Sequence, residues 1–161
     1  MSSSKPAGEE SARALTAAVR YASAGVRSTR DVTIYLRRRG VAAGTINRAI
    51  AALRTRGLVD DDACARLWAE QWARRGYAAD AIRAKLAAKG LNDVTIYHAF
   101  AQLRITADDD TRAREVAARF LRPATGGRKR ARLARTLASR GFDSDQIEQV
   151  LNESLGPLVS S

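Results

Sequence analysis

Three segments of the chain repeat one arrangement of apolar residues and glycine. In each segment an apolar residue is followed by Gly at +4, an apolar residue at +5, Ile at +10 and another apolar residue at +14. The three sets are Leu36, Gly40, Val41, Ile46 and Ile50; Leu86, Gly90, Leu91, Ile96 and Phe100; and Leu137, Gly141, Phe142, Ile147 and Leu151. The glycines are 50 and then 51 residues apart, and a fixed period of this length indicates a tandem array of small structural units.

Each unit carries start and stop signals for three helices. Apolar residues recur at helical spacing, capping residues such as Ser28, Asn92 and Asp143 precede the periodic segments, and glycines follow many of them. The expected helices end near residues 25, 39, 56, 75, 89, 103, 121, 140 and 155, and no segment alternates between apolar and polar residues as a half-buried strand does. The sequence therefore predicts an all-α fold of three tandem three-helix repeats, forming an elongated, curved, modular body with some freedom at its joints.

Domain boundaries follow from the same signals. Residues 1–8, rich in Ser, Pro and Gly, are expected to be a disordered tail, and residues 156–161 a second tail. The three repeats are expected at 9–57, 58–105 and 106–155. A unit of about 50 residues is marginal for a hydrophobic core of its own, so neighbouring repeats should support one another.

Positive charge is the strongest functional signal. The formal net charge is +11, which favours polyanions or an acidic protein surface as partners. Residues 1–57 hold 11 basic and 3 acidic residues, 58–105 hold 7 and 6, and 106–161 hold 10 and 8. A charge run is often only a solvated face, but phosphate contacts would make binding fall steeply with salt. The candidate contact residues are Arg37, Arg38, Arg39, Arg54, Arg56, Arg74, Arg75, Arg122, Arg128, Lys129, Arg130, Arg132, Arg135 and Arg140.

Residues that could carry catalysis have simpler interpretations. The triplets Asp60–Asp62 and 108–110 stand at helix starts, where aspartate caps free amides. His98 has no cysteine at ligand spacing, and no spacing ties Cys64 to a basic partner. Trp68 and Trp72 are interpreted as packing residues, with base stacking or a partner hot spot as the alternative. We expect no enzyme activity and no metal or cofactor.

The cellular setting follows from absences in the sequence. One cysteine excludes an internal disulfide and fits a reducing compartment. The chain shows neither a signal peptide nor an apolar run of membrane-spanning length. A cytoplasmic monomer without membrane contact is the expectation.

The central repeat resembles the RecX family, the bacterial modulators of the RecA recombinase. The match rests on an acidic pair, an aromatic-bearing helix, a basic turn and an I-x-x-x-L-x-x-K-G-apolar segment: Asp60, Asp61, Ala65, Arg66, Trp68, Arg75, Gly76, Tyr77, Ile82, Leu86, Lys89, Gly90, Leu91 and Ile96. Asp60, Asp61, Trp68, Gly76, Leu86, Gly90, Leu91 and Ile96 form its structural signature. The chain departs from the pattern at Cys64, where an aromatic residue is common, and at Lys85, where an acid is common.

The resemblance implies a non-catalytic, mainly negative regulator of RecA that lodges in the groove of the RecA–DNA filament. Such a protein reduces ATP hydrolysis and strand exchange, and so regulates DNA repair, recombination and the SOS response. It also implies weaker, salt-sensitive binding to single- and double-stranded DNA. From charge and the helical repeats alone, an autonomous helical DNA-binding protein or an adaptor for another acidic partner stays open.

Overall fold

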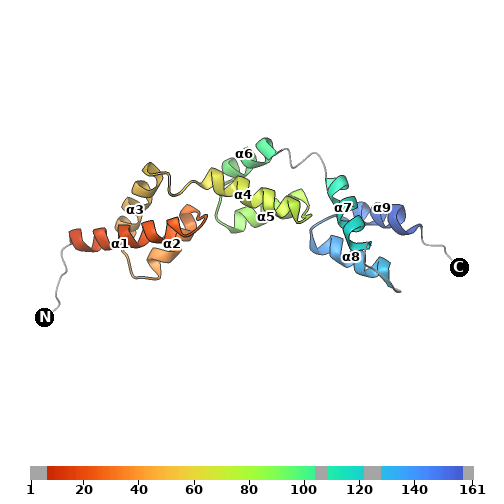
Figure 1. Ribbon diagram of the computed structural model, residues 1–161, viewed down its shortest axis with the longest axis horizontal. Coiled ribbons are helices and arrows are strands. Elements are labelled where there is room, and N and C mark those ends of the chain that lie inside the picture. Colours follow the sequence, from red (N-terminus) through yellow and green to blue (C-terminus); the bar gives the residue numbers. More distant parts are fainter. Residues whose placement is uncertain (1–6, 104–108, 122–127, 158–161) are drawn as a thin grey trace.

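A computed structural model describes residues 7–103, 109–121 and 128–157. Nine helices and no strand lie within these ranges. The helices are α1 (Ala7–Ser23), α2 (Thr29–Arg37), α3 (Ala43–Thr55), α4 (Asp61–Arg74), α5 (Ala79–Ala88), α6 (Asp93–Leu103), α7 (Asp109–Leu121), α8 (Lys129–Ser139) and α9 (Ser144–Leu155). They form three groups of three in a row, with α1 and α9 at opposite ends of a shallow arc (Figure 1). The predicted all-α fold of tandem three-helix repeats is confirmed.

Each group of three helices encloses its own small core. The first and third helices of a repeat pack together, the second packs against both, and every extensive helix–helix contact among the described helices lies within a repeat. Leu36 and Leu53 in the first core, Ile82 and Leu86 in the second, and Leu137 in the third are fully buried. Alanine fills much of the remaining space, so the helices approach closely on small side chains.

The repeated sequence pattern is the C-terminal cap of the second helix. Gly90 ends α5 with φ +83°, a left-handed conformation that costs glycine little. Its amide donates to the Ala87 carbonyl at 2.8 Å, and the Leu91 amide donates to the Leu86 carbonyl at 3.3 Å, which together make a Schellman motif. The same pair of bonds follows α2 at Gly40 and α8 at Gly141.

Most helix boundaries fall within two residues of those expected from the sequence. The predicted caps are confirmed at Ser28 and Asp143, which form capping boxes, and at Asn92, whose Oδ1 accepts from the Thr95 amide at 2.8 Å. The N-terminal tail was expected to reach residue 8, but α1 begins at Ala7. Of the aspartate triplet at 108–110, residue 108 lies outside the described residues, and Asp109 begins α7.

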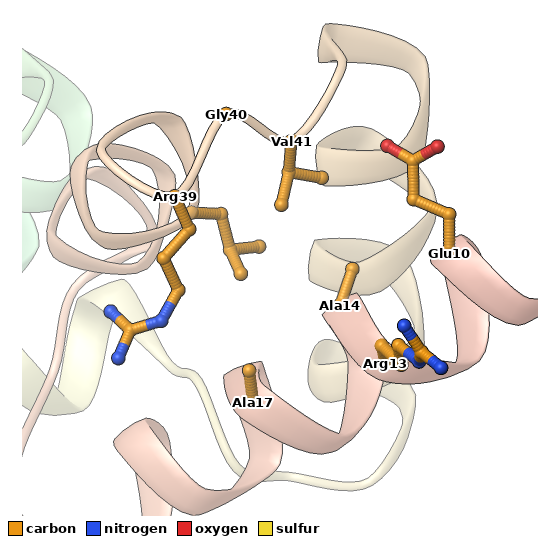
Figure 2. A pocket seen from close by; sticks show the side chains of 8 residues that line it. Glu10, Arg13, Ala14, Ala17, Arg39, Gly40 and Val41 are labelled. Atoms are coloured by element: carbon orange, nitrogen blue, oxygen red, sulfur yellow. The ribbon is translucent and has the colours of Figure 1, made fainter. Parts of the chain in front are cut away.

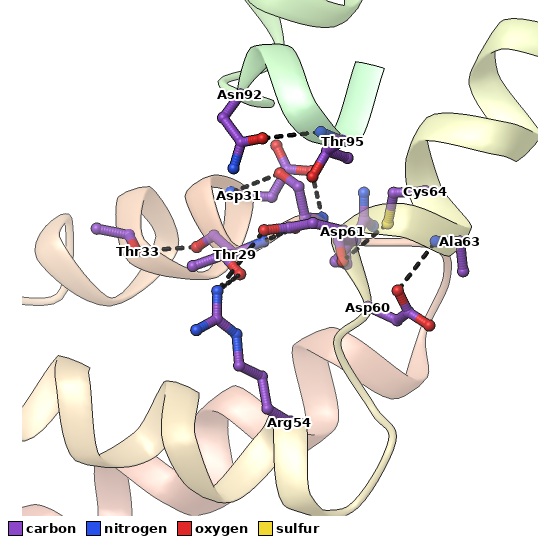
Figure 3. A network of polar contacts seen from close by, with 12 residues as sticks. Thr29, Asp31, Thr33, Arg54, Asp60, Asp61, Ala63, Cys64, Asn92 and Thr95 are labelled. Atoms are coloured by element: carbon purple, nitrogen blue, oxygen red, sulfur yellow. Dashed lines mark hydrogen bonds and ion pairs between the residues drawn. The ribbon is translucent and has the colours of Figure 1, made fainter. Parts of the chain in front are cut away.

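Two aspartates join the repeats instead of capping their own helices. Asp60 accepts from the Ala63 amide at 3.0 Å, as expected of a helix start. The next residue, Asp61, accepts from the Thr29 amide at the start of α2, at 2.8 Å (Figure 3). Asp109, which begins α7, accepts from the Ala79 amide at the start of α5 through both oxygens, at 3.0 and 3.1 Å. The first helix of each later repeat thus caps the second helix of the repeat before it.

The joint between the second and third repeats carries further contacts. The Ala78 amide donates to the Arg140 carbonyl at 2.9 Å, and Ala78 itself is buried in the core of the third repeat. Arg140 Nε donates to the Arg75 carbonyl at 3.1 Å. A Cβ at Gly76 would overlap Val116 of α7, so the closeness of the two repeats depends on glycine there.

Candidate interaction surface

A stack of two tyrosine rings lies between two guanidinium groups on the first repeat. Tyr21 of α1 and Tyr35 of α2 are parallel, with ring centroids 4.1 Å apart and planes 9° apart. The Arg27 guanidinium lies 4.6 Å from the centroid of Tyr21, and that of Arg39 lies 4.0 Å from the centroid of Tyr35. Because the inner ring faces contact each other, the two cations cover the outer faces, where the ring quadrupoles attract them.

The central repeat also places cations over aromatic rings, with lysines in place of arginines. Lys89 Nζ lies 5.0 Å from the ring centroid of Trp68, and Lys85 Nζ lies 5.7 Å from Trp72 and 4.5 Å from Tyr77. Both tryptophans are half-buried against the core of the repeat. The packing interpretation of Trp68 and Trp72 is therefore confirmed, and each also carries a cation on its exposed side.

The third repeat follows the same rule with one pair, Arg132 over Phe120 at 5.8 Å. In all three repeats these pairs lie between the first and second helices. We call this set the cation–aromatic face. It comprises Tyr21, Arg27, Tyr35, Arg39, Trp68, Trp72, Tyr77, Lys85, Lys89, Phe120 and Arg132. None of its cations forms an ion pair with a carboxylate among the described residues, so its positive charge is uncompensated.

The basic residues expected to make contacts divide by what their side chains touch. Arg39 and Arg132 belong to the cation–aromatic face. One group has no side-chain hydrogen bond or ion pair within the described part of the chain: Arg37, Arg38, Arg56, Arg75, Arg128, Lys129 and Arg135. Lys129 is half-buried and the other members of this group are exposed. Arg122 lies outside the described residues.

Four of the expected contact residues are instead engaged within the protein. Arg130 donates to the Gly156 carbonyl at 2.7 Å and to Asn152 Oδ1 at 2.6 Å, which ties α8 to the end of α9. Arg54 donates to Thr29 Oγ1 at 3.1 Å and pairs with Asp61 at 3.8 Å (Figure 3). Arg140 holds the joint described above, and Arg74 pairs with Glu70 at 2.6 Å. Intramolecular carbonyls and carboxylates already occupy these guanidinium groups.

A pocket of about 410 Å³ lies beside the cation–aromatic face of the first repeat. Figure 2 shows Ala14 and Ala17 of α1 facing the turn at Arg39 and Val41. The floor is apolar, and Glu10, Arg13 and Arg39 border it. The third repeat has a smaller pocket of about 250 Å³, bordered by Arg119 and Arg140.

Cys64 and His98, interpreted above as non-catalytic, lie at a joint and on an exposed helix face. Cys64 is buried at the joint of the first two repeats, where its Sγ donates to the Arg27 carbonyl at 3.3 Å. Burial, together with the nearby Asp61, Asp31 and Asp60 carboxylates, raises the pKa of the thiol to about 11. His98 is exposed on α6 beside Tyr97. Within the described residues, no group of His, Cys, Asp and Glu could hold a metal ion.

Comparison with known proteins gives a consistent result. A family model described as the third three-helix domain of RecX matches residues 108–151. The regulatory protein RecX of Streptomyces coelicolor is 29% identical over 150 residues, spanning 91% of this chain and 78% of that protein. The regulatory protein RecX of Chromohalobacter salexigens is 36% identical over 115 residues, spanning 70% of this chain and 74% of that protein. The chain belongs to the RecX family.

The fold agrees with crystal structures of the family. RecX from Lactobacillus salivarius superposes with a TM-score of 0.70 at 18% identity, over 91% of this chain and 97% of that one. A second RecX crystal structure gives a TM-score of 0.68 at 21% identity, over 89% of this chain and 72% of that one. The described helices include none that is both long and apolar enough to cross a membrane.

The RecX signature residues in this chain are mainly architectural. Asp60 caps α4 and Asp61 holds the first joint. Gly76 and Gly90 end helices with positive φ, and the signature residues Leu86, Leu91 and Ile96 line the central core with Trp68 packed against it. The departure at Lys85 puts a cation on Tyr77 and Trp72, and the departure at Cys64 puts a small side chain in a joint.

Proposed function

We propose that this protein is a non-catalytic, mainly negative regulator of the RecA recombinase that binds in the groove of the RecA–DNA filament. Membership of the RecX family is the observation that carries this proposal. The elongated arc of three repeats supports it, because a body of this shape can follow a helical groove and contact successive subunits (Figure 1). The protein would act in the cytoplasm as a monomer, without a cofactor.

The cation–aromatic face supports contact with the DNA component of the filament. Uncompensated cations attract phosphates, and the aromatic rings beneath them hold these cations at the surface of the protein. Two rings of the first repeat and two tryptophans of the second combine both features. Affinity for free DNA should be weak and salt-sensitive, since such contacts are mainly electrostatic.

A RecA ATPase assay on single-stranded DNA tests the proposal. Adding the protein at substoichiometric to equimolar amounts should lower the rate of ATP hydrolysis. A rate that stays constant at every ratio would refute regulation of RecA.

A matched pair of variants tests the basic surface. Arg37→Gln with Arg38→Gln removes two exposed cations that pair with no carboxylate in the described part of the chain, whereas Arg13→Gln with Arg74→Gln removes two that pair with Glu9 and Glu70. Both variants lower the net charge by two, so a difference between them reports local contacts and not total charge. The first pair should weaken the effect on RecA more than the second.

The cation–aromatic face also favours a second candidate, an autonomous DNA-binding protein. Titration of labelled DNA without RecA over a salt series separates the two. Tight binding that survives physiological salt and depends on base sequence would favour the second candidate, and weak, salt-labile binding would favour the first.

A further inference from the structure

Helix α6 exposes the two most open large apolar side chains among the described residues. Val94 is 63% exposed and Tyr97 is 66% exposed. They are three residues apart and therefore neighbours on one helix face, and the exposed His98 lies next to them, with its ring 6.1 Å from that of Tyr97. Thr95, Ile96, Ala99 and Phe100 of the same helix are buried, so Val94 and Tyr97 project away from the core and have no role in holding the repeat together.

The equivalent positions of the other repeats are not apolar. Asn47 of α3 and Glu148 of α9 occupy the place of Tyr97 in the repeat, and Gly44 and Asp145 occupy the place of Val94. All four are exposed. Exposed apolar side chains at this position are thus a property of the central repeat and not a requirement of the three-helix unit.

Charge also distinguishes this face from the rest of the molecule. The chain carries +11, yet residues 90–103 contain no lysine or arginine. Asp93 begins the helix, and a pocket at the same end holds three carboxylates and one cation, Arg54, which pairs with Asp61. The pocket is lined by Arg54, Asp60, Asp61, Asp62, Asn92 and Thr95. Two cations that contact this helix are already engaged: Arg66 donates to Gln102 at 3.2 Å, and Arg83 lies 4.2 Å over the Phe100 ring. A polyanion gains little from such a face.

We propose that Val94 and Tyr97 anchor a protein-docking surface that takes an apolar recess bordered by basic side chains. Tyrosine is enriched among residues that dominate interface energies, and the acidic end of the face complements basic groups on the partner. The inference rests on the function proposed above, in which the partner is the RecA protein and not its DNA. The cation–aromatic face and the α6 surface then address different components of one filament.

The test uses Val94→Gln with Tyr97→Gln in the full chain. Both positions are exposed and glutamine is a good helix former, so circular dichroism should show an unchanged helix content. The matched control is Ile34→Gln, which removes an apolar side chain exposed by 36% on α2. Each variant is measured for its effect on RecA ATPase and for binding to a labelled single-stranded oligonucleotide without RecA.

The double variant should need about tenfold or more protein for the same effect on RecA, because truncating a hot spot costs at least that much affinity. Its affinity for the oligonucleotide should equal that of the wild type, and Ile34→Gln should change neither. A double variant with the wild-type effect overturns the assignment, as does a parallel loss of oligonucleotide binding, which would place DNA on this face. Analytical ultracentrifugation gives a further check. If the wild type is a dimer and the double variant is a monomer, the α6 surface binds a second copy of this chain and the assignment is overturned. A wild type inactive on RecA overturns the proposed function itself, and this assignment with it.

Discussion

Replacing either joint aspartate by alanine should destabilise the protein, and Asp109→Ala should cost more than Asp61→Ala. Both residues accept from the first amide of the preceding repeat's second helix. α5 has no side-chain cap of its own, since Ala78 stands at its N-cap, whereas α2 keeps a capping box from Ser28 and Asp31. Among the described residues, Asp109 therefore supplies the only side-chain acceptor at the start of α5, whereas Asp61 adds to the existing capping box at the start of α2.

The magnitudes follow from the partners that each carboxylate leaves behind. Loss of a helix cap costs about 1 kcal/mol. Asp109 also pairs with Arg112, whose side chain is only 12% exposed, and a mostly buried guanidinium without its acceptor costs about 1–3 kcal/mol more. Asp61 pairs at 3.8 Å with Arg54, which is 59% exposed, and such a pair contributes at most about 0.5 kcal/mol. The expected losses are about 2–4 kcal/mol for Asp109→Ala and about 1–1.5 kcal/mol for Asp61→Ala.

Urea denaturation followed by circular dichroism measures both losses. Tryptophan fluorescence adds a local probe, because Trp68 and Trp72 both lie in the central repeat that the two joints flank. Asp109→Asn is the control, because it keeps an acceptor for the Ala79 amide but removes the charge that faces Arg112. Its free energy of unfolding should be about 1 kcal/mol higher than that of Asp109→Ala. Equal losses for the two alanine variants, or a loss below about 0.5 kcal/mol for Asp109→Ala, would refute this account of the joints.

Three further outcomes are expected. Gly141→Ala should lower the free energy of unfolding by about 3 kcal/mol, and Gly40→Ala by about 1 kcal/mol. Both glycines have positive φ, but of the two only Gly141 has a neighbour, Ala81, that an added Cβ would overlap. Thermal denaturation measures the difference in stability. Arg130→Ala should cost about 1–3 kcal/mol through its two lost hydrogen bonds, whereas Arg135→Ala should leave stability unchanged and lower the salt slope of DNA binding by about one. Native Cys64 should react with iodoacetamide at pH 8 about 100-fold more slowly than the urea-unfolded chain, since a pKa near 11 reduces its thiolate fraction; equal rates would contradict its burial.

The repeat architecture could be predicted because its signals are local. The bonds that end α2, α5 and α8 join residues at most five positions apart, so the leucine, glycine and following apolar residue of each motif identify the turn directly. The capping boxes at Ser28 and Asp143 are equally local. The predicted helix ends therefore agree with the structure to within about two residues, the usual scatter at helix termini.

The joints and the surface could not be predicted in the same way. Asp61 and Thr29 are 32 residues apart and Asp109 and Ala79 are 30 apart, so an aspartate at a helix start looks like a cap for that helix. Whether an arginine side chain donates to a backbone carbonyl also depends on tertiary packing: Arg130 donates to the carbonyl of Gly156, 26 residues away. The cation–aromatic face left one signal in the sequence, the 50-residue spacing of Tyr35 from Lys85 and of Arg39 from Lys89, which becomes meaningful only once the rings are located.

The distribution of acids explains how one small protein can present two unlike surfaces. Asp31, Asp60, Asp61, Asp109 and Asp143 all accept from amides at helix starts, where the helix dipole already favours negative charge. The other 12 of the 17 acidic residues face 28 lysines and arginines, and five of these cations lie over aromatic rings between the first and second helices. On α6 the cations are missing and apolar side chains are exposed instead. Contact with nucleic acid and contact with protein would therefore require different helices, and a substitution on one face should leave binding through the other intact.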